Sequence, residues 1–210
     1  MRTRIKVCGL INADDAAYAA RLGSDAIGLV FYPPSPRHVE ISRAVEIVRA
    51  LPAFVTVVGL FVDEQEATIR QILEQVPIDC LQFHGEEPQA ACNIYGKRYI
   101  KAVRMRDDTD VTALTEHYHD ADALLLDAYD PVRQGGTGGR FDWNLVPKIS
   151  KKPIILAGGL DVNNVNLAIK QTRPYAVDVS TGVESEKGKK NKSKIAAFIA
   201  AVDQGNKIIT

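Results

Sequence analysis

The chain has 210 residues, 46% of them hydrophobic, and its 26 lysine and arginine residues balance its 26 aspartate and glutamate residues. A formal net charge of zero gives no indication of a nucleic acid or an anionic membrane as partner. No apolar run approaches the roughly 18 residues of a membrane span, and the start, MRTRIKVCGL, lacks the apolar region of a signal peptide. Three cysteines without metal-type spacing argue against a disulfide framework and for a reducing compartment. We therefore expect a soluble, cytoplasmic protein.

Segments typical of strands alternate with segments typical of helices along the whole chain. The predicted strands are residues 3–8, 25–31, 55–62, 79–84, 98–104, 122–127, 153–157 and 176–179. The predicted helices are residues 13–22, 42–51, 65–75, 87–95, 109–118, 142–149, 161–171 and 192–203. This alternation predicts a parallel α/β fold. Eight near-regular units favour a closed (β/α)8 TIM barrel over a doubly wound open sheet, and because no linker divides the chain we expect a single domain over residues 1–210.

The first and last strands place charged side chains inside the predicted barrel. In RIKVC, Ile5 and Val7 suit the layer beneath the helices, so Lys6 and Cys8 should point inward. Closure sets the last strand beside the first, so we expect Lys6 and Asp178 to form a buried ion pair. Cys8 ends its strand at the rim where barrel enzymes carry catalytic groups. A nearby cation such as Lys6 would lower the pKa of its thiol and make it a general base; a small buried core residue is the alternative.

Three later segments that follow strands carry further candidate residues. Arg37 emerges from the stiff proline loop PPSPRHV, where a fixed guanidinium would grip a carboxylate; a solvated surface arginine is the alternative. His84, at the end of CLQFHG, is interpreted as lining a pocket, or else as bonding a neighbouring loop. Asp127 ends the apolar strand ADALLLD, where shielding favours the protonated form that a general acid needs; a loop cap is the alternative. The glycine-rich run at 135–140 is interpreted as a loop over the barrel mouth.

The last two predicted strands each stop at small residues. Gly158-Gly159 follows the first of them and Ser180-Thr181-Gly182 follows the second. Free backbone N–H groups at such turns, together with the positive end of a helix dipole, make an anion site. In (β/α)8 barrels the turns after strands 7 and 8 hold a phosphate group. We therefore interpret these five residues as a phosphate-binding site, with ordinary glycine turns as the alternative.

Taken together, these segments resemble the phosphoribosylanthranilate isomerases of tryptophan biosynthesis. The matching segments, in the order of the family and over nearly the whole chain, are KVCGL, GLVFYPPSPRHV, VGLFVDE, LQFHGEE, LLLDAYD, GGTGGRFDW, ILAGGLDVNNV and VDVSTGVES followed by GKK. The resemblance implies that Cys8 is the general base, that Asp127 is the general acid and that Arg37 holds the anthranilate carboxylate. It also implies that the turns after strands 7 and 8 bind the phosphate. The expected substrate-binding residues are Arg37, His84, Gly158, Gly159, Asp178, Ser180, Thr181 and Gly182.

The implied reaction is an Amadori rearrangement of N-(5-phosphoribosyl)anthranilate to 1-(2-carboxyphenylamino)-1-deoxyribulose 5-phosphate. Asp127 would protonate the furanose ring oxygen, and Cys8 would remove the proton from C2. Such proton transfers need no metal and no redox cofactor, and the sequence shows neither a metal-ligand cluster nor a dinucleotide fingerprint. The expected partner is a small phosphorylated substrate, with the protein a monomer or a weak homodimer.

Three other functions stay open on the sequence. The related sugar isomerase of histidine biosynthesis would need a second phosphate site and an aspartate in place of Cys8. Indole-glycerol-phosphate synthase, a lyase, would need a catalytic lysine and glutamates on early strands, and DAIGLVF offers neither. A catalytically silent barrel that only binds phosphorylated ligands would not need both Cys8 and Asp127.

Overall fold

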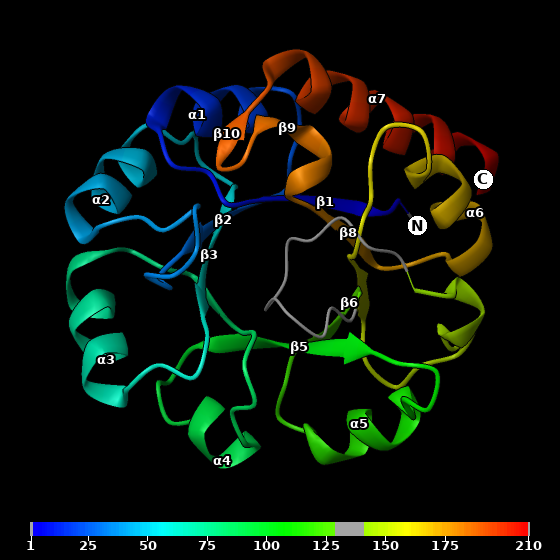
Figure 1. The fold of residues 1–210 in the computed structure, drawn as a ribbon, viewed down its shortest axis with the longest axis horizontal. Helices are drawn as coiled ribbons and strands as arrows, with labels where there is room; N and C mark the ends of the chain where they lie inside the picture. Colours follow the sequence, from blue (N-terminus) through cyan, green and yellow to red (C-terminus); the bar gives the residue numbers. More distant parts are fainter. Residues whose placement is uncertain (1, 129–140, 210) are drawn as a thin grey trace.

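Eight parallel strands close into a barrel in the order β1-β2-β3-β4-β5-β6-β7-β8 in the computed structural model, which describes residues 2–128 and 141–209. β1 pairs with both β2 and β8, which closes the cylinder, and the helices form a ring around it (Figure 1). The predicted (β/α)8 barrel is therefore confirmed over the open sheet. The predicted loop at 135–140 lies outside the described residues.

Each barrel strand lies within one residue of its predicted bounds. The strands are β1 (Arg4–Cys8), β2 (Ala26–Val30), β3 (Thr56–Phe61), β4 (Cys80–Phe83), β5 (Arg98–Met105), β6 (Ala123–Ala128), β7 (Ile154–Leu156) and β8 (Ala176–Val179). This agreement follows from short runs rich in β-branched residues and leucine, most of which stop at polar or small residues that mark strand ends well.

The barrel interior is filled by a cluster of small and branched side chains contributed by successive strands. Its buried members are Val58, Cys80, Ile100, Ala102, Ala123, Leu125, Ile155, Ala157 and Ala176. Because side chains alternate along a strand, the residue two positions further on points to the same face. The interior face therefore continues to His84 on the β4 side, to Asp127 on β6 and to Asp178 on β8. The larger apolar cluster lies between the strands and the surrounding helices.

The helices differ more from their predicted bounds than the strands do. They are α1 (Ala13–Arg21), α2 (Ile41–Arg49), α3 (Glu66–Gln75), α4 (Gln89–Cys92), α5 (Val111–His117), α6 (Val165–Thr172) and α7 (Lys192–Ile209). No helix of the described part of the chain is both long enough and apolar enough to cross a membrane.

Two predicted helices are reduced to about one turn. The expected helix at 142–149 is only the 3-10 turn η1 (Trp143–Leu145), because Pro147 lacks the N–H that a continuing helix needs. The expected helix at 87–95 contracts to α4, because Glu87 belongs to the preceding loop. Its carboxylate accepts hydrogen bonds from the backbone N–H groups of Gly85 and Asp63 and from Lys101 Nζ.

A segment between β8 and α7 was not predicted. The 3-10 turn η2 (Thr181–Val183) leads into an antiparallel hairpin of β9 (Glu184–Glu186) and β10 (Lys189–Lys190). In Figure 1 this hairpin lies close to α1 and to the beginning of α7. Strands of two or three residues are too short to show the alternation by which strands are predicted.

We predict that Phe198→Ala destabilises the fold by about 3–5 kcal/mol, because the ring lies in the core beneath α7 and its loss leaves a cavity. The matched control is Phe54→Ala, because Phe54 is 104% exposed and its loss should change stability by less than about 0.5 kcal/mol. Urea unfolding of both variants measures the difference. Equal midpoints for the two variants would contradict this placement of α7.

Candidate active site

Cys8 and Asp127 lie at the carboxyl ends of β1 and β6, on the same rim of the barrel. Only β7 and β8 separate their strands around the closed barrel, and these two strands run into Gly158 and Ser180. Both side chains are buried, at 5% and 8% exposure. The structure thus places a thiol and a carboxyl group on either side of the two predicted phosphate turns.

One layer below Cys8, the predicted ion pair is present. Lys6 Nζ lies 2.9 Å from Asp178 Oδ1, and both side chains are buried. Burial opposes the charge on Lys6, but the attraction of Asp178 and Cys8 outweighs it and raises the pKa of the ammonium group. The expectation that Lys6 points inward and pairs with Asp178 is confirmed.

The expected lowering of the Cys8 pKa is wrong. Burial raises the pKa of the Cys8 thiol, and although Lys6 and Lys190 oppose this shift, their attraction does not outweigh the loss of water. Sequence reasoning identified one neighbouring cation but not how completely the barrel buries the sulfur.

Gly28 gives the thiol its space, and sequence reasoning missed it. The residue pairs with Cys8 between β1 and β2, and a Cβ atom on Gly28 would lie 2.7 Å from Cys8 Sγ. A glycine inside a strand commonly marks such a close approach, so the signal was present in AIGLV.

Asp127 is held by a short chain of hydrogen bonds from β4. His84 Nε2 lies 3.1 Å from Asp127 Oδ2, and Gln82 Nε2 lies 2.9 Å from His84 Nδ1. Because an amide nitrogen can only donate, Nδ1 accepts in this arrangement, and Nε2 is the ring nitrogen that faces Asp127. The backbone N–H of Ala128 donates to Oδ1 at 2.9 Å. His84 therefore contacts a catalytic candidate directly, and Gln82, which was not predicted, orients it.

Arg37 is buried, at 8% exposure, so a solvated surface arginine is excluded. Its Nε and Nη2 donate to Glu184 Oε1 and Oε2 at 2.7 and 2.8 Å. A Cβ atom on Gly9 would lie 2.6 Å from Arg37 Cδ, so the arginine side chain crosses the residue next to Cys8. Among the described residues Nη1 has no hydrogen-bond partner. The guanidinium is fixed in place with one nitrogen left over for a ligand.

The two predicted phosphate turns contact the same part of the rim. Gly158 has a φ of 79°, and a Cβ atom there would lie 2.5 Å from the backbone nitrogen of Ala128, next to Asp127. A Cβ atom on Gly182 would collide with the carbonyl oxygen of Leu160, so the turn after β8 packs on the turn after β7. The structure brings the predicted turns together beside Asp127.

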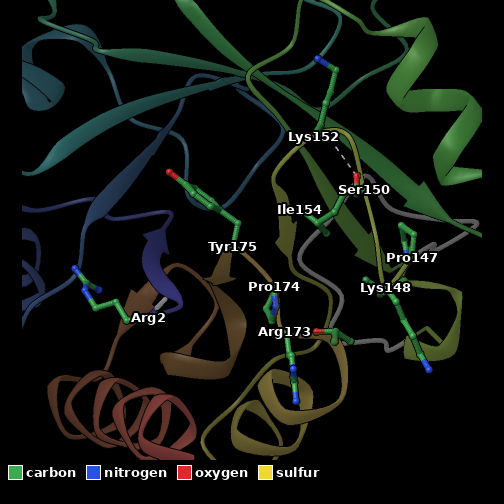
Figure 2. Close-up of a pocket in the computed structure, with 11 residues that line it drawn as sticks. Arg2, Pro147, Lys148, Ser150, Lys152, Ile154, Arg173, Pro174 and Tyr175 are labelled. Atoms are coloured by element: carbon green, nitrogen blue, oxygen red, sulfur yellow. Dashed lines mark hydrogen bonds between the residues drawn. The ribbon is translucent and has the colours of Figure 1, made fainter. Parts of the chain in front are cut away.

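A hollow of about 260 Å³ lies on the opposite side of the barrel (Figure 2). Its lining includes Arg2, Ile154 and Tyr175, which stand at or before the amino ends of β1, β7 and β8. In barrel enzymes that face contributes to stability, whereas active sites lie at the carboxyl ends of the strands. The hollow in Figure 2 is therefore separate from the candidate active site.

The chain is similar over nearly its whole length to proteins of one family. The family model described as N-(5'phosphoribosyl)anthranilate (PRA) isomerase matches residues 5–201. A relative from Nitrosococcus oceani, named N-(5'-phosphoribosyl)anthranilate isomerase, is 56% identical over 206 residues, covering 98% of this chain and 100% of the relative. A relative of the same name from Azotobacter vinelandii is 54% identical over 199 residues, covering 95% and 97% of the two chains.

Solved structures agree with the sequence relatives. The phosphoribosyl anthranilate isomerase from Thermotoga maritima matches with a TM-score of 0.88 and 37% identity, covering 96% of this chain and 99% of that chain. A second isomerase structure, in complex with reduced 1-(o-carboxyphenylamino)-1-deoxyribulose 5-phosphate, matches with a TM-score of 0.85 and 36% identity over the same shares. By sequence and by fold, therefore, this chain belongs to the N-(5'-phosphoribosyl)anthranilate isomerase family of tryptophan biosynthesis.

Proposed function

We propose that Cys8 and Asp127 carry the isomerisation of N-(5-phosphoribosyl)anthranilate to 1-(2-carboxyphenylamino)-1-deoxyribulose 5-phosphate as general base and general acid. The observation that supports this most strongly is their placement. Both groups end strands on one rim, and the strands between them lead into the phosphate turns. A sugar phosphate anchored at those turns lies between a thiol and a carboxyl group, as an acid–base rearrangement requires.

The two ends of the substrate have separate binding sites in this proposal. Gly158, Gly159, Ser180, Thr181 and Gly182 bind the phosphate, because backbone N–H groups at turns between a strand and a helix favour an anion. Arg37 binds the anthranilate carboxylate through Nη1, while Glu184 keeps its other two donors in place. A product analogue in a similar solved structure carries both a carboxylate and a phosphate, which agrees with two separate anion sites.

The chemistry consists of proton transfers. Asp127 gives a proton to the furanose ring oxygen, and the C1–O bond opens to a Schiff base. The Cys8 thiolate then removes the proton from C2, which gives an enolamine. The enolamine tautomerises to the ketone. C1 is reduced as C2 is oxidised, so the rearrangement needs no external oxidant or reductant and this chemistry calls for no metal and no redox cofactor. The positive charge of the Lys6 ammonium acts against the effect of burial on the Cys8 pKa and so favours the thiolate during that step.

Two residues of the substrate-binding set act beside the reacting groups. His84 holds the Asp127 carboxyl group through Nε2, and Asp178 holds the Lys6 ammonium below Cys8. Both residues lie on the interior face of their strands, so we place them beneath the sugar ring. Their positions support a role in substrate binding through the groups that they orient.

We infer that residues 1–210 form one catalytic domain that works in the cytoplasm on a small phosphorylated molecule, with no nucleic acid or membrane as partner. The expected assembly is a monomer or a weak homodimer. A similar solved structure shows mutually generated monomers of the dimeric isomerase from Thermotoga maritima. Sedimentation equilibrium over a range of concentrations distinguishes the two forms, and a tight dimer at all concentrations would contradict this part of the proposal.

We predict that Cys8→Ala and Asp127→Asn each lower kcat by about 10²–10⁴-fold, the usual contribution of a general base or acid. KM should change little, because neither group holds the phosphate or the carboxylate. The assay is the loss of substrate fluorescence on adding purified protein. Cys92→Ala is the matched cysteine control, because Cys92 is buried on α4 rather than at the rim, and it should keep its activity. Near-normal turnover in both rim variants would refute the assignment.

We further predict that Cys8→Asp shifts the pH profile of kcat/KM toward acidic pH. Burial raises the pKa of the Cys8 thiol, whereas a carboxylate at the same position is already ionised at neutral pH. A profile that is the same in wild type and Cys8→Asp would exclude residue 8 as the base.

A further inference from the structure

Lys190, on the unpredicted β9–β10 hairpin, is a fully buried cation beside the candidate site. Its side chain is 0% exposed. The ammonium group lies 3.1 Å from the Ser180 carbonyl oxygen, 3.2 Å from Ser180 Oγ and 2.8 Å from Glu184 Oε1. These contacts use the three donors of a lysine ammonium. A lysine is almost never buried in this way without a specific set of partners.

Glu184 connects Lys190 to the opposite end of the substrate site. The Glu184 carboxylate accepts hydrogen bonds from Nε and Nη2 of Arg37 and from Nζ of Lys190. Burial opposes its charge, but Arg37 and Lys190 outweigh this effect and lower the pKa of Glu184. Glu184 is therefore an anion between two cations, and the three groups together carry a net charge of +1.

The hairpin is also fixed against the loop that carries Arg37. A Cβ atom on Gly188, in the hairpin turn, would collide with the carbonyl oxygen of Pro36. The backbone N–H of Asn191 donates to the Val183 carbonyl oxygen at 2.8 Å, and Lys194 Nζ donates to that of Glu184 at 2.7 Å. The hairpin thus has little freedom relative to η2 on one side and to the proline loop on the other.

We propose that Lys190 is a positioning residue that couples the phosphate end of the substrate site to the carboxylate end. It holds the carbonyl and hydroxyl groups of Ser180, and so fixes the turn after β8. It also balances Glu184, so that Arg37 keeps one net positive charge for the substrate carboxylate. This inference rests on the substrate placement proposed above. Lys190 also lies near enough to Cys8 for the charge of each group to affect the pKa of the other. This proximity agrees with a position of Lys190 between the two ends of the substrate site.

The test measures the two ends separately, with inorganic phosphate and anthranilate as competitive inhibitors. We predict that Lys190→Met weakens inhibition by both, by roughly 10-fold or more, the contribution of a hydrogen bond to a charged group. Phosphate inhibition weakens because Ser180 is released. Anthranilate inhibition weakens because an unbalanced Glu184 cancels the charge of Arg37. The matched control is Lys189→Met, the neighbouring lysine, whose side chain is 69% exposed; both inhibition constants should stay within about 2-fold of wild type.

The double variant Glu184→Gln with Lys190→Met separates the two effects. Arg37 alone then supplies the net charge of +1, so inhibition by anthranilate should recover toward wild type. Ser180 still lacks its donor, so inhibition by phosphate should stay weak. The double variant has no carboxylate at position 184, so no buried charge there loses its partner. It therefore also tests the inference if Lys190→Met alone does not fold.

Two results would overturn the inference. One is a folded Lys190→Met variant whose two inhibition constants match those of Lys189→Met. The other is a double variant that binds phosphate as tightly as wild type. If neither inhibitor competes with substrate in the wild-type enzyme, the proposed substrate placement itself fails. If both compete in wild type and Lys190→Met changes neither, only the coupling role of Lys190 fails.

Discussion

The arrangement of the site depends on the closure of the barrel between β1 and β8. That closure pairs Lys6 with Asp178 in register, and the two side chains form a buried ion pair. A lone ammonium group inside the barrel would be costly, so the pair favours this closure over others in which the charges do not meet. Once Lys6 is opposite Asp178 and Val7 is opposite Val179, Cys8 is fixed one layer above the ion pair, at the end of β1. The pairing of the two charges therefore also sets the thiol on the side of the predicted phosphate turn after β8.

Charge pairing continues from this layer to the rim. Above the Lys6–Asp178 pair, Glu184 is held between Arg37 and Lys190, and Asp127 is held by His84. Each of these buried groups therefore already has a partner in the structure, so we expect little rearrangement of them on binding. Preorganised groups of this kind stabilise charge that develops during the reaction without the cost of reorienting water.

Much of the fold follows from the sequence because its signals are local. Most strands are short runs rich in β-branched residues and leucine, and the alternation within RIKVC and AVDV already indicates the ion pair. The wrong predictions of secondary structure also have physical causes. Pro147 interrupts a helix that the apolar pattern favours, and Glu87 leaves its helix to satisfy loop N–H groups and Lys101. The hairpin of β9 and β10 is too short to show any period.

Some residues of the candidate site could likewise be predicted from the sequence, and others could not. Cys8, Asp127 and the glycine turns were predicted, because each stands at a strand end where the fold itself locates it. Glu184 and Lys190 were not, because their meaning depends on Arg37, and Glu184 lies 147 residues away from it in the chain. The direction of the Cys8 pKa shift was also missed, since it depends on the total burial of the sulfur rather than on a neighbouring residue type.

The most direct test of the account is a crystal structure of this protein with reduced 1-(o-carboxyphenylamino)-1-deoxyribulose 5-phosphate bound. The account predicts the phosphate at the turns 158–159 and 180–182, the carboxylate on Arg37 Nη1, and the sugar carbons between Cys8 Sγ and the Asp127 carboxyl group. An analogue with its sugar out of reach of either Cys8 or Asp127, or with its phosphate on Arg37, would contradict it.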